Sequence, residues 1–378
     1  MNQKQEINPL FTLLIDVYWG LPFFKEAINA IREQTYTNLE IIISNNGASQ
    51  EITNFINSQA KEDSRIKIIS YKENLFRLRD PNYFFFVIAN DGLKKASGKY
   101  FFYQSYDDML APNYIEKMIK LFEGNPSCIS ASGRQVNIDE KTSVDKDELL
   151  NRTSNFRPRY MPGYQLVLET LKPNGSKVFS ASGTCFSFKR DVLISQGGFY
   201  RSEEAHELYG LVPLGETGFD EDAILFWRKH EGQTNKLLYN RGHSGLNELY
   251  DFIDEFQLQK KWEVHGKSVA KKVVDHMTYT LSKTSADQTL RLLSGLRFAG
   301  ALRLFFNSIT KHHYRNCLYT EFMAKKRHYL LIFIYQFHYF ARPLLKLLNS
   351  FISKRTTNLL ILKRLNNFFF LKDDWYLP

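Results

Sequence analysis

Residues 99–108 read KYFFYQSYDD, a short apolar run that ends in two neighbouring carboxylates. The run has the length of a buried strand, and it follows Ser97-Gly98, a signal that ends helices. Asp107 and Asp108 therefore come directly after a predicted strand. Adjacent carboxylates suit Mg²⁺ or Mn²⁺, which bind oxygen ligands together with substrate phosphates. A solvated turn or a helix N-cap explains the same residues without a metal, and this motif alone leaves both interpretations open.

The sequence before this stretch alternates strand-like and helix-like patterns. The predicted strands are Phe11–Tyr18, Leu39–Ser44, Ile66–Ser70 and Lys99–Gln104, and the predicted helices are Leu21–Gln34, Ile52–Lys61, Phe84–Ala96 and Asn113–Glu123. Apolar strands separated by helices predict an α/β fold with a mostly parallel open sheet and right-handed crossovers. Ligands of such sheets bind beyond the carboxyl ends of the strands. Asn45, Asn46, Asp107 and Asp108 each follow a strand, so we expect them to converge there.

The remaining sequence predicts two further kinds of structure. Residues 140–180 are polar and rich in Pro and Gly, which indicates an irregular insertion or acceptor-side loop. Residues 184–199 return to a strand, a helix and a Gly-Gly break, and the sequence from about 255 onward is mainly helical. We therefore expect one domain over residues 1–250 and a helical, basic region over residues 251–378.

Composition restricts the class of protein. Of 378 residues, 43% are hydrophobic and 24% charged, which is typical of a folded globular protein. Three widely spaced cysteines argue against a disulfide framework and fit a reducing compartment. The polar start of the chain lacks the apolar run of a signal peptide, and the longest apolar run, Tyr329–Phe340, is shorter than the roughly 20 residues of a membrane span. We therefore expect a cytoplasmic location for the domain over residues 1–250.

The net charge of +10 is concentrated at one end of the chain. Residues 291–370 carry 14 basic residues and a single acid, Glu321, whereas residues 1–250 are nearly neutral. Basic residues mixed with Leu, Phe and Tyr at helical spacing suit an anionic membrane surface. A helical subdomain with a solvated basic face is the plainer alternative. A nucleic-acid-binding protein is a third, but it leaves the carboxylates after the strands unexplained.

Several short motifs occur in a characteristic order. They are LIDVYW at 14–19, AINAIREQTY at 27–36, NNGAS at 45–49, NDGLKKASGKY at 90–100, SYDD at 105–108, Gly197-Gly198-Phe199 and Glu221-Asp222. Together they resemble family 2 glycosyltransferases of the GT-A fold, over roughly residues 10–245. Neither Gly-x-Gly-x-x-Gly nor a P-loop motif occurs, so the two commonest phosphate-binding loops are excluded.

The resemblance implies a GT-A nucleotide-sugar-binding catalytic domain over residues 1–250. It implies a divalent metal, Mn²⁺ or Mg²⁺, held by Asp107, Asp108 and His243. Asp222 would be the general base with Glu221 beside it, and a base opposite one metal implies a single displacement with inversion. A helix that starts over residues 218–223, where acids are favourable, explains the same pair without catalysis. The implied donor-binding residues are Asp16, Tyr18, Asn45, Asn46, Asn90, Ser105 and Asp107.

The sequence departs from the family pattern at the donor side. Ser105 replaces the first carboxylate of the metal motif, Asn45 and Asn46 replace carboxylates of the nucleobase site, and Asp16 replaces a proline. An amide both accepts and donates hydrogen bonds, so donor binding is compatible with these changes while donor preference shifts. The same departures leave open an inactive homologue that binds a sugar or nucleotide.

The resemblance also implies partners. They are a nucleotide-sugar donor and a glycan or lipid-linked acceptor, in capsule or O-antigen-type polysaccharide synthesis. Such acceptors lie at the inner face of the cell membrane, which agrees with the basic region 291–370 and implies a cytoplasmic, peripheral membrane protein. No nucleic acid is expected.

Overall fold

The computed structural model describes residues 8–76, 83–144, 158–172, 186–200, 205–233, 252–253 and 256–278. The chain divides into two compact units, residues 1–281 and 282–378, and all the described residues belong to the first. The basic region 291–370 lies outside them, and the domain boundary expected at residue 250 stays a prediction. None of the described helices is long and apolar enough to cross a membrane.

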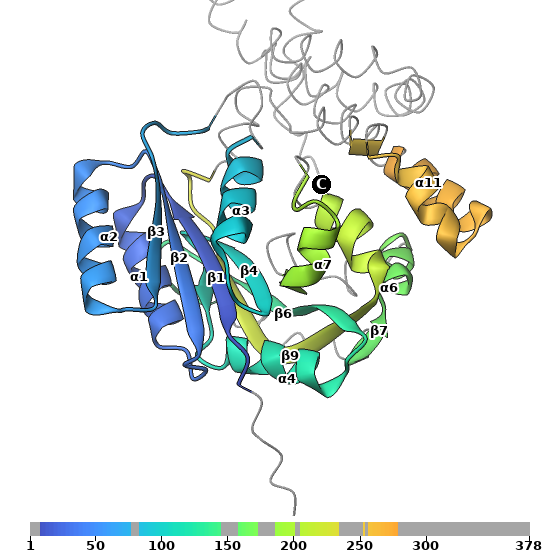
Figure 1. Cartoon of the computed structure of the whole chain (residues 1–378), viewed down its shortest axis with the longest axis horizontal. Helices are drawn as coiled ribbons and strands as arrows, with labels where there is room; N and C mark the ends of the chain where they lie inside the picture. Colours follow the sequence, from blue (N-terminus) through green and yellow to red (C-terminus); the bar gives the residue numbers. More distant parts are fainter. Residues whose placement is uncertain are drawn as a thin grey trace, which may run out of the picture. The chain divides into compact units, whose positions relative to one another are not determined.

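The amino-terminal third forms the alternating pattern that the sequence predicts (Figure 1). Its elements are β1 (Phe11–Val17), α1 (Leu21–Arg32), β2 (Leu39–Asn46), α2 (Gln50–Glu62), β3 (Ile66–Tyr71), α3 (Tyr83–Lys95) and β4 (Tyr100–Ser105). Strands β1, β2, β3 and β4 are all parallel, with β1 between β2 and β4. The predicted bounds are confirmed to within two or three residues, because the apolar runs and their turn signals are local features.

The following elements complete one mixed sheet. They are β5 (Met109–Leu110), α4 (Tyr114–Gly124), β6 (Cys128–Ile138), β7 (Tyr160–Pro162), α6 (Gly163–Thr170), β8 (Phe186–Lys189), α7 (Arg190–Ser195), a π-helix (His206–Leu211), a 3₁₀ turn (Val212–Leu214), β9 (Glu216–Arg228), α11 (Leu258–Trp262) and a second 3₁₀ turn (Glu263–His265). Helical residues also span 267–278. The strand order is β3-β2-β1-β4-β8-β6-β9-β5, and β7 pairs with β9. The sheet is α/β as predicted, but β5, β7 and β8 pair antiparallel to their neighbours.

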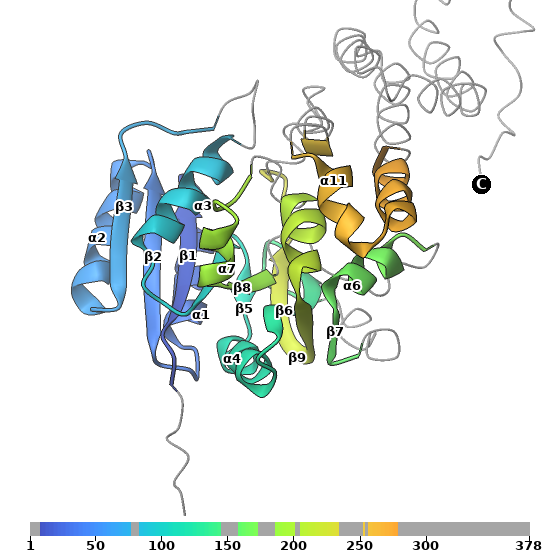
Figure 2. The same cartoon turned by 45° about the vertical axis from the view of Figure 1, so that its right-hand side comes forward.

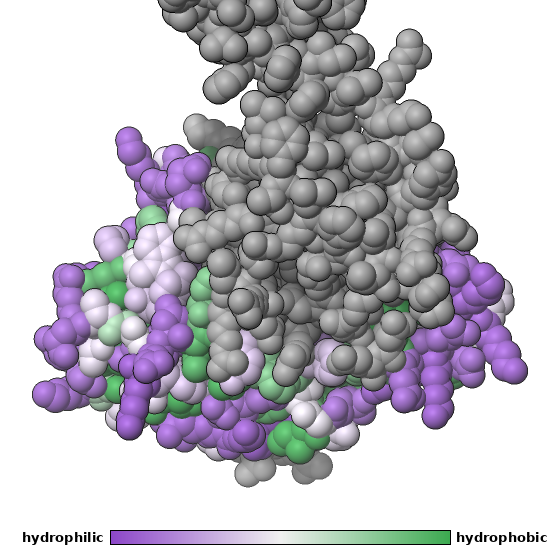
Figure 3. All heavy atoms as spheres, turned by 90° about the horizontal axis from the view of Figure 1, so that it is seen from above, coloured by the Kyte–Doolittle hydropathy of each residue, from purple (hydrophilic) through white to green (hydrophobic). Residues whose placement is uncertain are grey.

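Helices cover both faces of this sheet (Figures 1 and 2). The main core lies on the face of α1, α2 and α4, where Phe24, Ala27, Ile28 and Ile31 of α1 are completely buried against β1 and β2. That spacing is the apolar stripe of an amphipathic helix. Helices α3 and α7 lie on the other face, and the outer surface on the side of α2 is mainly hydrophilic (Figure 3).

Two expectations about the second half of the domain are wrong. Residues 140–180 are not irregular throughout, since β7 and α6 lie there. Glu221 and Asp222 do not start a helix but lie inside β9, which pairs in parallel with β6. The register shifts between Gly133 and Arg134, where residues 221–223 of β9 form a bulge. Ala223 and Leu225 are buried in the core, so pairing and burial outweigh the preference of acids for helix starts.

Candidate active site at the carboxyl ends of the parallel strands

The carboxyl ends of β1 and β4 lie side by side at the point where the strand order reverses. From β1 the chain continues to β2 and β3 on one side, and it returns to β4 on the other. Asp16 of β1 and Ser105 of β4 occupy the same register position there. Open α/β sheets bind ligands in the crevice at this switch point. The strand topology thus brings together two residues that the sequence places 89 positions apart.

Asp107 follows β4 directly and presents a carboxylate that is still accessible. Its side chain is 13% exposed, and its Oδ2 lies 2.8 Å from Nε2 of His230. The His230 ring is buried between Trp19 and Phe23, with ring centroids 5.5 Å and 5.0 Å away. Sequence analysis missed His230, because a single histidine two residues beyond a strand carries no signal until the fold brings it to Asp107.

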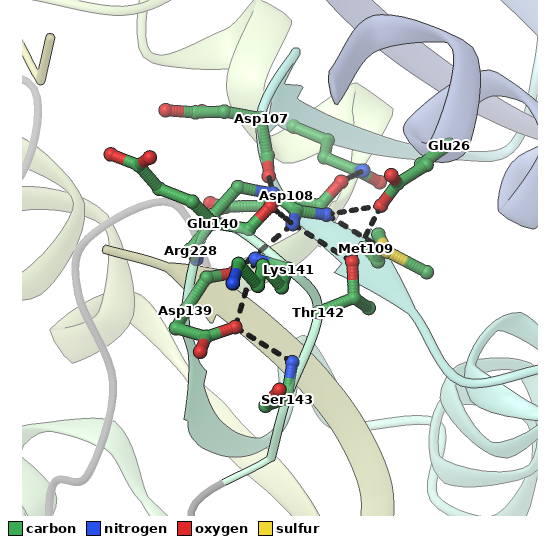
Figure 4. Close-up of polar contacts among 11 residues, drawn as sticks. Glu26, Asp107, Asp108, Met109, Asp139, Glu140, Lys141, Thr142, Ser143 and Arg228 are labelled. Carbon is green, nitrogen blue, oxygen red and sulfur yellow. Dashed lines mark hydrogen bonds and ion pairs between the residues drawn. The ribbon is translucent and has the colours of Figure 1, made fainter. Parts of the chain in front are cut away.

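Asp108 points into the protein instead (Figure 4). It is 2% exposed, and its Oδ1 accepts a hydrogen bond from the main-chain N–H of Arg228 at 3.0 Å. Burial, followed by the charge of Asp107, raises the pKa of Asp108 well above its usual range. Asp108 is therefore not placed at the surface beside Asp107, and a metal held by both carboxylates stays a prediction. The two side chains of the pair leave the backbone in different directions, and only Asp107 reaches the surface.

Arg228, at the end of β9, is the second residue that sequence analysis missed. Its side chain is completely buried, and its Nε donates to the main-chain oxygen of Asp107 at 2.9 Å. Another guanidinium nitrogen donates to Oε2 of Glu26 on α1 at 2.6 Å. The turn that carries Asp107 is therefore attached both to β9 and to α1.

Asp16 is a buried carboxylate next to Asp107. It is 4% exposed, and Oδ1 accepts a hydrogen bond from the Tyr103 hydroxyl at 2.7 Å. Burial raises the pKa of Asp16 to about 7, the Tyr103 hydrogen bond opposes that shift, and the charge of Asp107 adds to it. Asp16 thus changes its charge near neutral pH, at the strand end where a ligand is expected.

The raised pKa makes Asp16 destabilising at high pH. Between the unfolded pKa of about 3.9 and the folded value near 7, the folded state holds a proton that the unfolded state has lost, so stability falls as pH rises through this window. We expect Asp16→Asn, which can keep the Tyr103 hydrogen bond, to be more stable than the wild type by about 4 kcal/mol at pH 8. At pH 4 the difference should vanish. Urea unfolding at both pH values measures it, and a difference that does not depend on pH would contradict the assignment.

An aromatic group borders the same strand ends. The ring centroids of Tyr18, Trp19 and Tyr106 lie 5.9–6.3 Å from one another. Tyr18 is half-buried and Tyr106 is buried. The Trp19 ring lies so close to Gly232 that a Cβ there would overlap it. Tyr18, a predicted donor-binding residue, therefore lies beside Tyr106, the residue before Asp107, with part of its side chain accessible.

Asn45 and Asn46 lie at the end of β2 but are buried. Asn45 donates to the Thr53 hydroxyl at 2.9 Å and accepts from the Ala48 N–H at 3.0 Å. Asn46 accepts from the Leu75 N–H at 2.8 Å and is not exposed. Both amides thus stabilise the turns at this edge. The geometry does not support a direct contact between Asn46 and a nucleobase, and such a role for Asn45 stays a prediction.

The side chain of Asn90 on α3 bonds main-chain groups of a distant segment, and its donor contact stays a prediction. Its Nδ2 donates to the main-chain oxygen of Phe199 at 3.0 Å, and its Oδ1 accepts from the Phe199 N–H at 2.9 Å. A Cβ at Gly198, which has φ of +89°, would overlap the Asn90 side chain. The family-like Gly-Gly-Phe motif therefore joins the NDG motif on one face of the sheet, at a distance in sequence that no local pattern reveals.

The predicted catalytic pair does not lie with Asp107. Asp222 is in the bulge of β9, 62% exposed, and its carboxylate is 3.8 Å from Nζ of Lys117 on α4. Strand β9 is parallel to β6, and both β6 and β4 are antiparallel to β8, so β9 runs in the same direction as β4. The end of β9 that reaches Asp107 is therefore its last residue, Arg228. Asp222 precedes it by six residues, which is on the order of 15–20 Å along a strand. Glu221 lies in the same bulge, and His243 is outside the described residues.

Known proteins agree with this architecture. A family model described as glycosyl transferase family 2 matches residues 12–196. The crystal structure of residues 1–349 of Staphylococcus aureus TarS superposes with a TM-score of 0.52, covering 84% of this chain and 91% of that one, at 11% sequence identity. At this identity the likeness concerns the fold alone.

Two relatives extend the match in sequence. An uncharacterized glycosyltransferase of Rickettsia typhi is 31% identical over 246 residues, which cover 63% of this chain and 70% of that protein. One from Haemophilus influenzae is 37% identical over 130 residues, 34% of this chain and 38% of its own length. The chain therefore spans well under half of the second relative but most of the first. With the α/β sheet and the strand-end carboxylates, these matches place the chain in glycosyl transferase family 2.

Proposed function

We propose that this protein transfers a sugar from a nucleotide-sugar donor to an acceptor hydroxyl. The observation that carries the proposal is the accessible Asp107 carboxylate at the β1–β4 switch point, 2.8 Å from His230 and next to Asp16. Anionic ligands with a bound cation suit an edge that presents carboxylates, and this edge is where open α/β sheets bind nucleotides.

The residues at this edge fit a divalent ion that arrives with the donor. Among the described residues, no group of three or more His, Cys, Asp or Glu side chains could enclose a metal by itself. Mg²⁺ and Mn²⁺ need no such group, because one or two carboxylates and the phosphates of the substrate complete their ligands. Asp107 is the carboxylate available, and Asp108 supports it from inside. When bound, the ion would supply positive charge to the departing diphosphate.

The neighbouring residues suggest how the donor is held. The accessible part of the Tyr18 ring offers a stacking surface for a base or sugar. Ser105 and Asp16 lie at the end of adjacent strands, where a ribose hydroxyl or a base N–H can approach. Because Asp16 titrates near pH 7, it accepts a hydrogen bond when ionised and can donate one when protonated. We therefore propose Asp16, Tyr18, Ser105 and Asp107 as the donor contacts.

We further propose a single displacement with inversion, in which one residue removes the acceptor proton on the face opposite the diphosphate. The resemblance assigns this role to Asp222, whereas the structure places its carboxylate near Lys117. The two assignments predict different results for Asp222→Asn. If Asp222 is the base, the substitution should lower turnover by about 10²–10⁴-fold while donor binding is retained. If Asp222 only forms an exposed ion pair with Lys117, turnover should be nearly unchanged, because such a pair affects stability and by no more than about 1 kcal/mol.

The acceptor is proposed from the resemblance and the charge distribution. A glycan or lipid-linked glycan of a surface polysaccharide, such as a capsule or O-antigen, would be presented at the inner face of the cell membrane. The basic residues of region 291–370 favour an anionic surface, each contributing about 1 kcal/mol near such lipids. Sedimentation with vesicles of phosphatidylglycerol and with neutral vesicles tests this step independently of turnover.

Release of a nucleoside diphosphate tests the central proposal. The full chain is incubated with a panel of nucleotide sugars, with and without Mn²⁺, and thermal stabilisation identifies the donors that bind. We expect one donor to stabilise the protein and to be turned over only with the metal. A donor that binds but is never turned over, with cell-derived glycolipid as acceptor, would instead indicate a binding protein that retains the fold.

A further inference from the structure

Arg228 contacts both residues of the turn that carries Asp107 and Asp108 (Figure 4). Nε of Arg228 donates to the main-chain oxygen of Asp107 at 2.9 Å, and its main-chain N–H donates to Oδ1 of Asp108 at 3.0 Å. A guanidinium group of this kind presents its N–H donors in a rigid planar fork. Arg228 therefore fixes the position of the turn at both residues while leaving the Asp107 carboxylate accessible.

The other side of the guanidinium reaches two further segments. One terminal nitrogen donates to the main-chain oxygen of Asp139 at 3.2 Å and to the Thr142 hydroxyl at 3.0 Å. The other donates to Oε2 of Glu26 at 2.6 Å. The guanidinium carbon also lies 4.9 Å from the centre of the Phe23 ring. Arg228 thus joins the turn after β4, the turn after β6 and helix α1.

The backbone near Thr142 indicates that this arrangement is closely specified. Thr142 has φ of +64°, which is unusual for a β-branched residue and costs free energy that the surroundings must offset. Its hydroxyl accepts from Arg228 and donates to Oε2 of Glu26 at 2.8 Å. The network therefore holds a strained residue in place, which a loosely packed loop would not do.

The charge of Arg228 matches its surroundings. A completely buried cation is costly unless it is paired and hydrogen-bonded, and an apolar side chain would serve a purely structural position at least as well. Here the guanidinium is paired with Glu26 and donates to the main-chain oxygen of Asp107, next to the carboxylate that faces outward. A charged fork at this position therefore serves the placement of the Asp107 turn in addition to stability.

We propose that Arg228 is a positioning residue that presets Asp107 for the cation and diphosphate of the donor. This inference rests on the proposed transferase function and adds to it a residue of β9 that contacts no substrate. The main-chain N–H of Arg228 holds the Asp108 carboxylate inside, and the guanidinium holds the main chain of Asp107 so that its carboxylate faces outward. Loss of the fork should therefore weaken cation binding at Asp107, even though the charges of Asp107 and His230 are unchanged.

Two substitutions in the full chain test the inference, with Mn²⁺ alone as the probe. Arg228→Lys keeps the positive charge but cannot bond in four directions at once. Glu26→Gln weakens the far end of the network on α1. We expect the Kd for Mn²⁺, measured by electron paramagnetic resonance of the free ion, to rise about 10–100-fold in Arg228→Lys, the usual effect of removing a group that orients a metal ligand. Glu26→Gln should raise the Kd for Mn²⁺ less than Arg228→Lys does. In the double variant, the effects of the two substitutions on this Kd should not add.

Arg65→Lys is the matched control. Arg65 is partly buried, and like Arg228 it bonds several groups at once: both oxygens of Asp63 and the main-chain oxygen of Arg32, at the amino end of β3. Its loss should lower Tm without changing the Kd for Mn²⁺. In Arg228→Lys, turnover at low Mn²⁺ should recover when the ion is added in excess, and a purely structural defect would not recover.

The outcomes separate the inference from the function on which it rests. A wild-type Kd for Mn²⁺ in Arg228→Lys overturns the positioning role and leaves the transferase proposal intact. If the wild type does not bind Mn²⁺, the positioning role of Arg228 and the metal dependence of the proposed transferase are both overturned. If Arg228→Lys does not fold, an unchanged Kd in Glu26→Gln overturns the inference, since this variant acts on Asp107 only through Arg228.

Discussion

Asp107→Asn should lower kcat by about 10²–10³-fold and abolish its dependence on Mn²⁺, the effect expected when a group that stabilises developing charge is removed. The amide has the shape of the carboxylate and can keep the 2.8 Å contact with His230, but it carries no charge to hold a cation. Nucleoside diphosphate release at saturating donor, over a series of Mn²⁺ concentrations, measures the loss.

The same substitution should leave the fold intact. The charge of Asp107 raises the pKa of both Asp16 and Asp108, so its removal relieves like-charge repulsion. We therefore expect Tm to be equal to that of the wild type or higher. Asp275→Asn, an exposed carboxylate paired with Lys271, is the control and should keep full turnover. An Asp107→Asn protein that retains half of the wild-type rate would exclude Asp107 from the chemistry.

Gly133→Ala should have the largest effect on stability. Gly133 lies in β6 opposite the bulge of β9, and a Cβ there would overlap the main-chain oxygen of Ala223 and come within 2.8 Å of the Tyr114 ring. Backbone in a paired strand cannot move aside without breaking the pairing. We expect the free energy of unfolding to fall by more than about 4 kcal/mol, as large as the effects of the most disruptive substitutions in a core. Urea unfolding measures this loss, and failure to recover folded protein would also agree with it.

This variant also tests how the segment around Asp222 folds. If Glu221 and Asp222 began a helix instead of lying in a bulged strand, Ala223 would not press on Gly133 and the substitution would be mild. Gly124→Ala is the matched control. Its Cβ would approach only the Tyr160 hydroxyl, at 2.8 Å, and a side-chain tip can move. The control should lose about 1 kcal/mol.

The first part of the fold was predictable because its signals are local. Each strand from β1 to β4 is an apolar run of suitable length, and each helix has an apolar face, as in Phe24, Ala27, Ile28 and Ile31. Polar residues just after parallel strands can be placed at one edge without knowing the packing. For this reason the sequence predicts that Asn45, Asn46, Asp107 and Asp108 gather at one edge, and the structure places them at or just after the ends of β2 and β4.

The rest of the site depends on contacts between distant segments. His230 reaches Asp107 across 123 positions of sequence, and Arg228 reaches Glu26 across 202. The antiparallel insertion of β8 and the parallel pairing of β6 with β9 are likewise non-local, and they moved Asp222 from the expected helix start into a strand. Local propensity does not predict such pairings, because the free energy gained by burying Ala223 and Leu225 depends on the residues that they contact in the folded protein.

By itself, the sequence determined the alternating α/β order, the family, and the edge of the sheet at which the acidic residues gather, because all three follow from local periodicity and from the order of motifs. The tertiary structure alone decided which carboxylate faces outward. Asp107 and Asp108 are neighbours with identical chemistry, and their partners at and just beyond the end of β9 distinguish them: the main-chain N–H of Arg228 binds the Asp108 carboxylate, and the imidazole of His230 binds that of Asp107.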